Sequence, residues 1–119
     1  MSIDIRCYST VDCNELSIKL KYFMQKYGNI FNNAYCIFEP KIVFNRQEIN
    51  AMDDRVAKYN AESTLLIAEE FGMKNPRSSF SIRVIDKTFS VLDTPELANL
   101  LRKELGDSIL ILLNCETPI

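Results

Sequence analysis

The sequence predicts a single α/β (α+β) domain, residues 1–119, in which a mixed β-sheet is packed with helices. The length of 119 residues fits one domain, and the contents of 47% hydrophobic and 25% charged residues are ordinary for a globular protein. Apolar residues alternate or run continuously in some stretches and recur at helical spacing in others. These patterns predict the order β-α-β-β-α-α-β-β-α-β. Two helical crossovers and one hairpin imply parallel and antiparallel pairs in the same sheet.

The N-terminal stretch predicts a strand followed by a well-capped helix. Residues 3–8 alternate between apolar and polar side chains, as in a half-buried strand. Asp12 is placed to cap the next helix, with Glu15 completing a capping box. One apolar stripe follows at helical spacing: Leu16, Leu20, Phe23, Met24 and Tyr27. We expect Gly28 to end this helix.

Two short strands are predicted next. Residues 34–38 are continuously apolar, which is typical of a strand covered on both faces. A bend at residues 39–41 leads to a short strand at 42–44. Because Pro40 cannot donate a ladder hydrogen bond, this corner is expected at a sheet edge.

The longest helical signal runs from Arg46 to Gly72. Its first half has one apolar face, formed by Ile49, Met52, Val56 and Tyr59. From Leu65 the pattern widens, so we expect two helices, or one bent helix, with the joint at Asn60. Gly72 should end the run.

The C-terminal part predicts a hairpin, a helix and a buried strand. Residues 80–84 alternate, and across a turn at residues 86–87 the apolar side chains of Phe89 and Val91 match their register. Thr94 and Pro95 are a typical helix start, and Gly106 should end that helix. The apolar run at 109–113 is expected inside the sheet.

Charge and targeting signals limit the classes of function. The net charge is −2, and no segment has the basic excess that strong nucleic-acid binding requires. No apolar run is long enough to span a membrane, and the N-terminus lacks the pattern of a signal peptide. We therefore expect a cytoplasmic protein without a membrane partner.

Four cysteines and no histidine argue against metal or cofactor chemistry. No two of the cysteines form a Cys-x-x-Cys pair, so neither a zinc site nor another cofactor is expected. Cys13 at a helix start and Cys115 after the last strand are candidate nucleophiles, but a catalytic thiol usually needs a base. We expect reduced, structural cysteines and no catalytic residues.

Two groups of residues are candidate binding surfaces. On the long helical stretch, a protein-partner surface is predicted at Arg46, Ile49, Met52, Asp53 and Val56, with ordinary core packing as the alternative. In the loop after Gly72, a site for an anion or an RNA end is predicted at Lys74, Arg77 and Ser78, with a solvated loop as the alternative.

Several motifs follow one another in a recognisable order. They are a helix start at Val11-Asp12, an apolar strand reaching residues 39–43, a helix entry at residues 46–49 and a helix end at residues 68–74. This order resembles the PRPK-binding protein family, the small kinase-binding subunit of the KEOPS complex. This resemblance covers residues 3–86.

The resemblance implies a non-catalytic regulatory subunit. Such a protein docks on the small atypical kinase of KEOPS and supports threonylcarbamoyl-adenosine modification of tRNA. Family members carry an additional helix and polar loop before the Phe-Gly helix end, and this part is linked to gripping the 3′ end of tRNA. Here only four residues separate Lys58 from Ser63, so this additional part is missing and the resemblance implies tRNA contact less strongly than it implies kinase binding.

Two other functions remain open. A small inhibitor or immunity-type protein would bind and neutralise a basic toxin or nuclease through its acidic helices, although a net charge of −2 favours this only weakly. A thiol-dependent enzyme would use Cys13 or Cys115 as its nucleophile.

Overall fold

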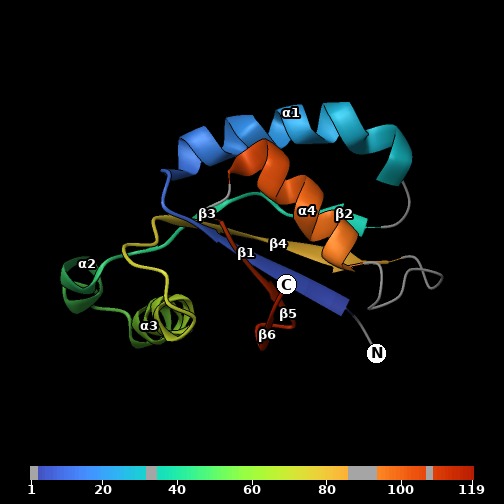
Figure 1. Ribbon diagram of the computed structural model, residues 1–119. Helices are drawn as coiled ribbons and strands as arrows, with labels where there is room; N and C mark the ends of the chain where they lie inside the picture. Colours follow the sequence, from blue (N-terminus) through green and yellow to red (C-terminus); the bar gives the residue numbers. More distant parts are fainter. Residues whose placement is uncertain (1–2, 32–34, 86–93, 107–108) are drawn as a thin grey trace.

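A computed structural model describes residues 3–31, 35–85, 94–106 and 109–119 of the chain. Helices lie on both sides of a six-stranded sheet (Figure 1). The elements are β1 (Ile3–Ser9), α1 (Cys13–Phe31), β2 (Tyr35–Ile37), β3 (Lys41–Ile42), α2 (Arg46–Asn50), α3 (Arg55–Glu70), β4 (Ser78–Val84), α4 (Thr94–Leu105), β5 (Leu110–Leu113) and β6 (Thr117–Pro118). The predicted α+β class, with helices packed on a sheet, is confirmed.

Every pairing between the described strands is antiparallel. The sheet order is β2-β4-β1-β5-β6, and β3 pairs with the other end of β4. The crossover through α1 does connect two strands that point the same way, as the sequence indicated. However, β4 lies between β1 and β2, so these two strands are not neighbours, and the expectation of parallel pairs is wrong for the described strands.

The main core lies between one face of the sheet and the helices α1 and α4. Side chains alternate along β1 and β4, so Ile5 and Cys7 share this face with Phe80 and Ile82. The helices contribute buried side chains of their apolar stripes: Leu16, Leu20, Phe23, Tyr27, Leu97, Leu101 and Leu105. Each fully buried side chain of this size contributes about 1.5–3 kcal/mol of transfer free energy, so this layer dominates stability.

A polar contact joins the two helices of this layer. Glu104 of α4 accepts hydrogen bonds from Lys26 Nζ at 2.8 Å and Tyr27 Oη at 2.9 Å, both on α1. The hydrogen bond from Lys26, followed by that from Tyr27, lowers the pKa of Glu104. The carboxylate is therefore held in its charged form at the seam between α1 and α4.

A second, smaller core holds α2 and α3 against the opposite face of the sheet (Figure 1). Its buried members are Tyr8, Val43, Ile49, Leu65, Ala68 and Leu112. Tyr8 and Leu112 come from β1 and β5, and the others come from the segment between β3 and β4. The sheet is thus the only layer that both cores share.

The start of α1 agrees with the prediction, but its end does not. Asp12 accepts the backbone N–H of Glu15 at 2.8 Å, which confirms the predicted cap. Gly28 does not end the first helix, because α1 continues to Phe31. A glycine inside a helix costs only about 1 kcal/mol, and the buried apolar stripe of α1 outweighs that cost.

The middle helical stretch is two helices, but the joint is not at Asn60. The break lies at residues 51–54, where the Asp54 carboxylate accepts the N–H groups of Val56 and Ala57 and starts α3. The end predicted at Gly72 is confirmed. Its φ of +88° fits a left-handed cap, and Met73 N–H donates to the Ala68 carbonyl at 3.1 Å.

The edge strands also differ from prediction. Residues 34–38 were expected to be covered on both faces, but β2 lies at the sheet edge, with Cys36 and Phe38 exposed. Because Pro40 falls between β2 and β3, it does lie at this edge as predicted.

At the other end of the sheet, the run at 109–113 forms β5 inside the sheet, as predicted. Asn114 and Cys115, both at positive φ, turn the chain into β6, which was not predicted. The predicted hairpin turn at 86–87 and the strand around Phe89 and Val91 lie outside the described residues.

Candidate partner-binding site

The predicted protein-partner residues occupy different environments on the α2–α3 unit. Ile49 is only 4% exposed and belongs to the second core, and Met52 is half-buried. Arg46 forms an ion pair with Glu69, which ties α2 to α3. Asp53 and Val56 are exposed. The structure therefore places Ile49 among core residues and leaves Asp53 and Val56 most accessible to a partner.

The residues of the predicted anion or RNA site also differ in their exposure to solvent. Lys74 and Arg77 are exposed, but Ser78 is fully buried and its hydroxyl donates to the Val11 carbonyl at 2.7 Å. That hydrogen bond joins the start of β4 to the segment before α1. Ser78 has no free surface for an anion, so only the two basic side chains remain at this loop.

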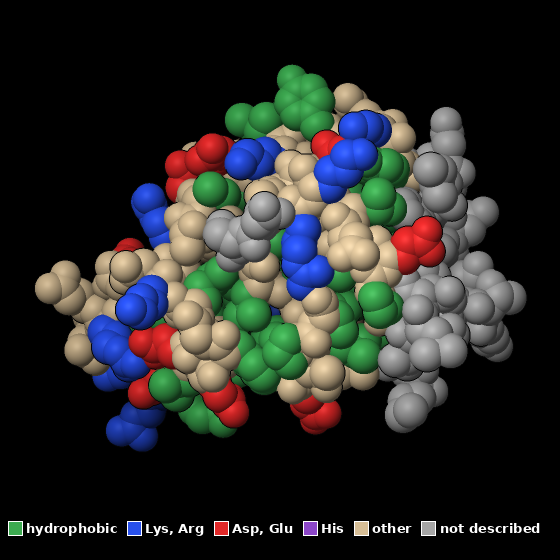
Figure 2. Space-filling view, in the orientation of Figure 1, with side chains coloured by type: hydrophobic (Ala, Val, Ile, Leu, Met, Phe, Trp, Pro, Cys, Tyr) green, Lys and Arg blue, Asp and Glu red, His purple; other side chains and the backbone are tan. Residues whose placement is uncertain are grey.

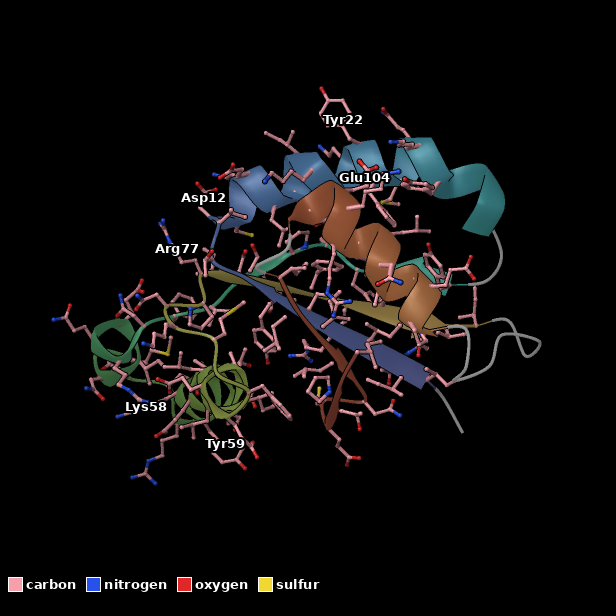
Figure 3. All side chains as sticks on the ribbon, in the orientation of Figure 1. Asp12, Tyr22, Lys58, Tyr59, Arg77 and Glu104 are labelled. Atoms are coloured by element: carbon pink, nitrogen blue, oxygen red, sulfur yellow. The ribbon has the colours of Figure 1, made fainter. Side chains whose placement is uncertain are left out.

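The outer face of α3 carries three exposed apolar side chains. Val56, Tyr59 and Leu66 are 69%, 70% and 49% exposed. Their spacing of three and seven residues places them along one side of the helix. Figure 3 shows Tyr59 directed away from the body of the protein, on the side opposite Tyr22 of α1. We call Val56, Tyr59 and Leu66 the outer stripe.

Sequence reasoning assigned Val56 and Tyr59 to the same face as Ile49, and that assignment is wrong. It assumed one continuous helix from Arg46, whereas the break at residues 51–54 changes the helical phase of everything that follows. The signal that could have found the break was the Asp53-Asp54 pair, because aspartate is a preferred N-cap. Leu66 was not assigned to a partner surface.

Acidic side chains surround the outer stripe. From residue 46 to residue 70 there are six acidic and three basic residues. Those exposed on or beside α3 include Asp53, Asp54, Glu62, Glu69 and Glu70. The stripe is thus an apolar centre with an acidic border, although the whole chain is almost neutral.

An open groove of about 1040 Å³ lies between α3 and the second face of the sheet. Its floor consists of polar side chains of β1 and β4, including Asp4, Arg6, Ser79, Ser81 and Arg83. Residues 38–44 and one side of α3 form its walls. Figure 2 shows hydrophobic side chains gathered in the hollow beside the α2–α3 corner.

The charges on the groove floor are not all paired. Arg83 Nε donates to Asp4 Oδ1 at 3.3 Å, and its guanidinium lies 5.7 Å from the centre of the Phe38 ring. Arg6 forms no ion pair among the described residues, and its buried Nε has no hydrogen-bond partner there. The Tyr8 hydroxyl is also buried near Arg6. Burial raises the pKa of Tyr8, and Arg6 partly opposes that shift through its positive charge and through a side-chain hydrogen bond.

The four cysteines lie in separate places. Cys7 is buried in the main core, and this burial raises the pKa of its thiol far above the ordinary value. Cys13 Sγ donates to the Pro40 carbonyl at 3.3 Å, whereas Cys115 lies at the turn before β6 beside the groove. Within the described ranges, no cluster of three or more His, Cys, Asp or Glu side chains could hold a metal ion.

Comparison with known families identifies the family of this chain. A family model described as "CDI System Immunity Component" matches residues 1–117. The chain belongs to this family. No curated protein sequence matches it.

The fold is also similar to a chain in the solved structure "CdiA-CT/CdiI toxin and immunity complex from Burkholderia pseudomallei". The TM-score is 0.72 at 20% sequence identity, over 98% of this chain and 95% of that chain. At this identity the similarity concerns the fold.

These findings overturn the resemblance to the PRPK-binding protein family. The family model of a CDI system immunity component covers residues 1–117, and the fold agrees with the solved structure over 98% of the chain. A KEOPS subunit, a kinase partner and a role in tRNA modification are therefore wrong. The motifs behind that resemblance are a helix cap, a Pro-containing strand end and a Phe-Gly helix end, which are local structural features shared by many folds. Among the described helices, none has the length and apolar character needed to cross a membrane.

Proposed function

We propose that this immunity component is a non-catalytic protein that binds a CdiA-CT-type toxin domain and neutralises it. The observation that carries the proposal is the match of residues 1–117 to the immunity family. The similarity to a chain of a toxin and immunity complex supports it, because the folds agree over almost the full length.

The α3 side of the molecule is the best candidate for the toxin-binding face. Exposed aromatic and aliphatic side chains at the centre of a polar border are the usual anatomy of a protein interface. The outer stripe provides that centre, and the acidic side chains around it favour a basic surface on the toxin. Arg46, Met52 and Asp53 lie on or next to the same unit and are proposed to contribute at its margin.

Neutralisation then requires only that the immunity component cover the toxin surface, and it needs no catalysed reaction. A toxin surface covered by a folded partner is closed to its own target, so no bond has to be made or broken by the immunity component. Tight binding is essential for this mechanism, because the free fraction of the toxin sets the residual toxicity. Local charge complementarity would increase the rate of association as well as its specificity.

The test uses a CdiA-CT-type toxin domain, chosen as the cognate partner of this chain. We expect co-production of the chain to restore growth of cells that make the toxin domain, and the purified proteins to form a stable complex in calorimetry. Tyr59→Ala combined with Leu66→Glu should weaken binding by about 30-fold or more, as expected for central interface residues.

The matched control is Tyr22→Ala combined with Ile18→Glu on α1. These side chains are as exposed as those of the outer stripe. Figure 3 shows Tyr22 on the other side of the protein, and Ile18 lies four residues before it on α1. This variant should bind and protect like the wild type. A wild-type chain that neither binds the toxin domain nor protects cells would refute the proposed function. Equal loss in both variants would refute the assignment of the face.

A further inference from the structure

The groove beside α3 contains the guanidinium of Arg6, which has no acidic partner within the described ranges and whose buried Nε donates to no acceptor there. Arg6 points to the groove side of β1, opposite Ser81 on β4 and Leu112 on β5, so neither cross-strand neighbour is acidic. Asp4, two residues away on the same face, is already paired with Arg83. A buried guanidinium N–H without an acceptor is unfavourable, and an incoming acceptor would remove that cost.

The size and lining of the groove fit a polypeptide segment better than a small metabolite. Its volume of about 1040 Å³ is at or beyond the upper end for small-molecule pockets, and it is open to solvent. Exposed apolar side chains of Phe38 and Ile42 line one wall, and hydroxyl groups of Ser79 and Ser81 lie on the floor. Such a groove offers apolar contacts to side chains and hydrogen bonds to an extended backbone.

The groove is continuous with the outer stripe. Ser63 lines the groove, four residues after Tyr59 and four before Ile67, which also lines it. Residues four apart in a helix are neighbours on its surface, so one side of α3 leads directly from the stripe to the groove wall. A partner that covers the stripe therefore lies at the mouth of the groove.

We propose that a segment of the toxin inserts into this groove and places a carboxylate side chain against Arg6. The inference rests on the proposed function and specifies how part of the partner is recognised. The guanidinium presents several N–H donors in a planar array that matches a carboxylate, and the partly enclosed floor strengthens such a charge-assisted bond. The outer stripe and the groove then contact regions of opposite charge on the toxin.

Three substitutions of Arg6 test the charge and the geometry with the same toxin domain. We expect Arg6→Gln to weaken binding in calorimetry by about 30-fold or more, as for the loss of one partner of a buried charged pair. Arg6→Glu should weaken it further through repulsion, and Arg6→Lys should retain more affinity than Arg6→Gln because it keeps the charge.

Thermal unfolding separates this role from a structural one. Because the Arg6 Nε has no partner among the residues that the structure describes, Arg6→Gln should leave the melting temperature unchanged or raise it. If the wild type binds the toxin and Arg6→Gln binds within twofold of it, the groove proposal is refuted while the proposed function stands. If the wild type does not bind, the proposed function itself fails.

A footprint at Cys115 gives a second measurement that needs no change at Arg6. Cys115 lines the groove, so in a background that combines Cys13→Ser with Cys36→Ser its rate of thiol labelling should fall at least tenfold when the toxin domain is bound. An added Tyr22→Cys on α1 serves as the control and should label at the same rate in both states. Equal labelling of Cys115 in the free protein and in the complex would overturn the proposal.

Discussion

Replacing Ile49 by alanine separates stability from binding on the α2–α3 unit. The side chain is 4% exposed and packs in the second core with Tyr8, Val43, Leu65 and Leu112. Truncation removes the equivalent of three methylene groups at about 0.8 kcal/mol each, or about 2.4 kcal/mol, before any cavity term is added. In a domain of 119 residues, 1 kcal/mol corresponds to about 4 °C in melting temperature. We therefore expect Ile49→Ala to lower the melting temperature by about 10 °C or more.

Val56→Glu is the matched surface change on the same unit. Val56 is 69% exposed in the first turn of α3, where glutamate has the better helix propensity and interacts favourably with the helix dipole. Its melting temperature should stay within about 2 °C of the wild type.

Calorimetry or circular dichroism on both purified variants measures these shifts. A loss below about 1 kcal/mol for Ile49→Ala would contradict its placement in the second core. A loss for Val56→Glu as large as that for Ile49→Ala would contradict the helical phase of α3.

Three further predictions concern local features. Asp54→Ala should cost about 1 kcal/mol in urea unfolding because it removes the cap of α3, whereas Asp53→Ala, which leaves that cap intact, should be close to neutral. Gly72→Ala should also cost about 1 kcal/mol or more, because φ of +88° is unfavourable for a residue with a Cβ, and an unchanged midpoint would contradict the cap geometry. Glu104 has a pKa below its ordinary value of 4.5, so its contribution to stability is present above pH 4.5 and is lost as the pH falls through the lowered pKa. Glu104→Gln should therefore flatten the decline of melting temperature below pH 4.5, and a decline as steep as that of the wild type would argue against the contact with Lys26 and Tyr27.

Local signals in the sequence were sufficient for much of the scaffold. The cap at Asp12, the stripe of α1 and the alternation along β4 each depend on residues close together in the chain, so they could be read directly. The antiparallel placement of β4 between β1 and β2 depends on contacts between distant segments, which periodicity does not report. The phase of α3 was missed because the Asp54 cap was read as part of a longer helix.

The candidate site was harder to predict than the fold. Val56 and Asp53 were identified as partner residues, and that assignment stays a prediction. Arg6 was not singled out, because in the alternating sequence of the first strand it occupies a polar position that is expected to face solvent. Its lack of an acidic partner emerges only when Ser81, Leu112 and the Asp4–Arg83 pair are placed around it. The family itself was found through the family model, since no local motif identifies it.

The division into two cores has a consequence for how this protein can change over generations. The outer stripe lies on a unit fastened by the second core, while most of the folding free energy comes from the layer of α1 and α4. Substitutions at distant, independent sites add without coupling. Under the proposed function, Val56, Tyr59 and Leu66 can therefore vary to follow a diverging toxin while Phe23, Leu101 and Ile111 continue to hold the scaffold. Separate sets of residues are thus exposed to the two kinds of selection, one for partner choice and one for folding.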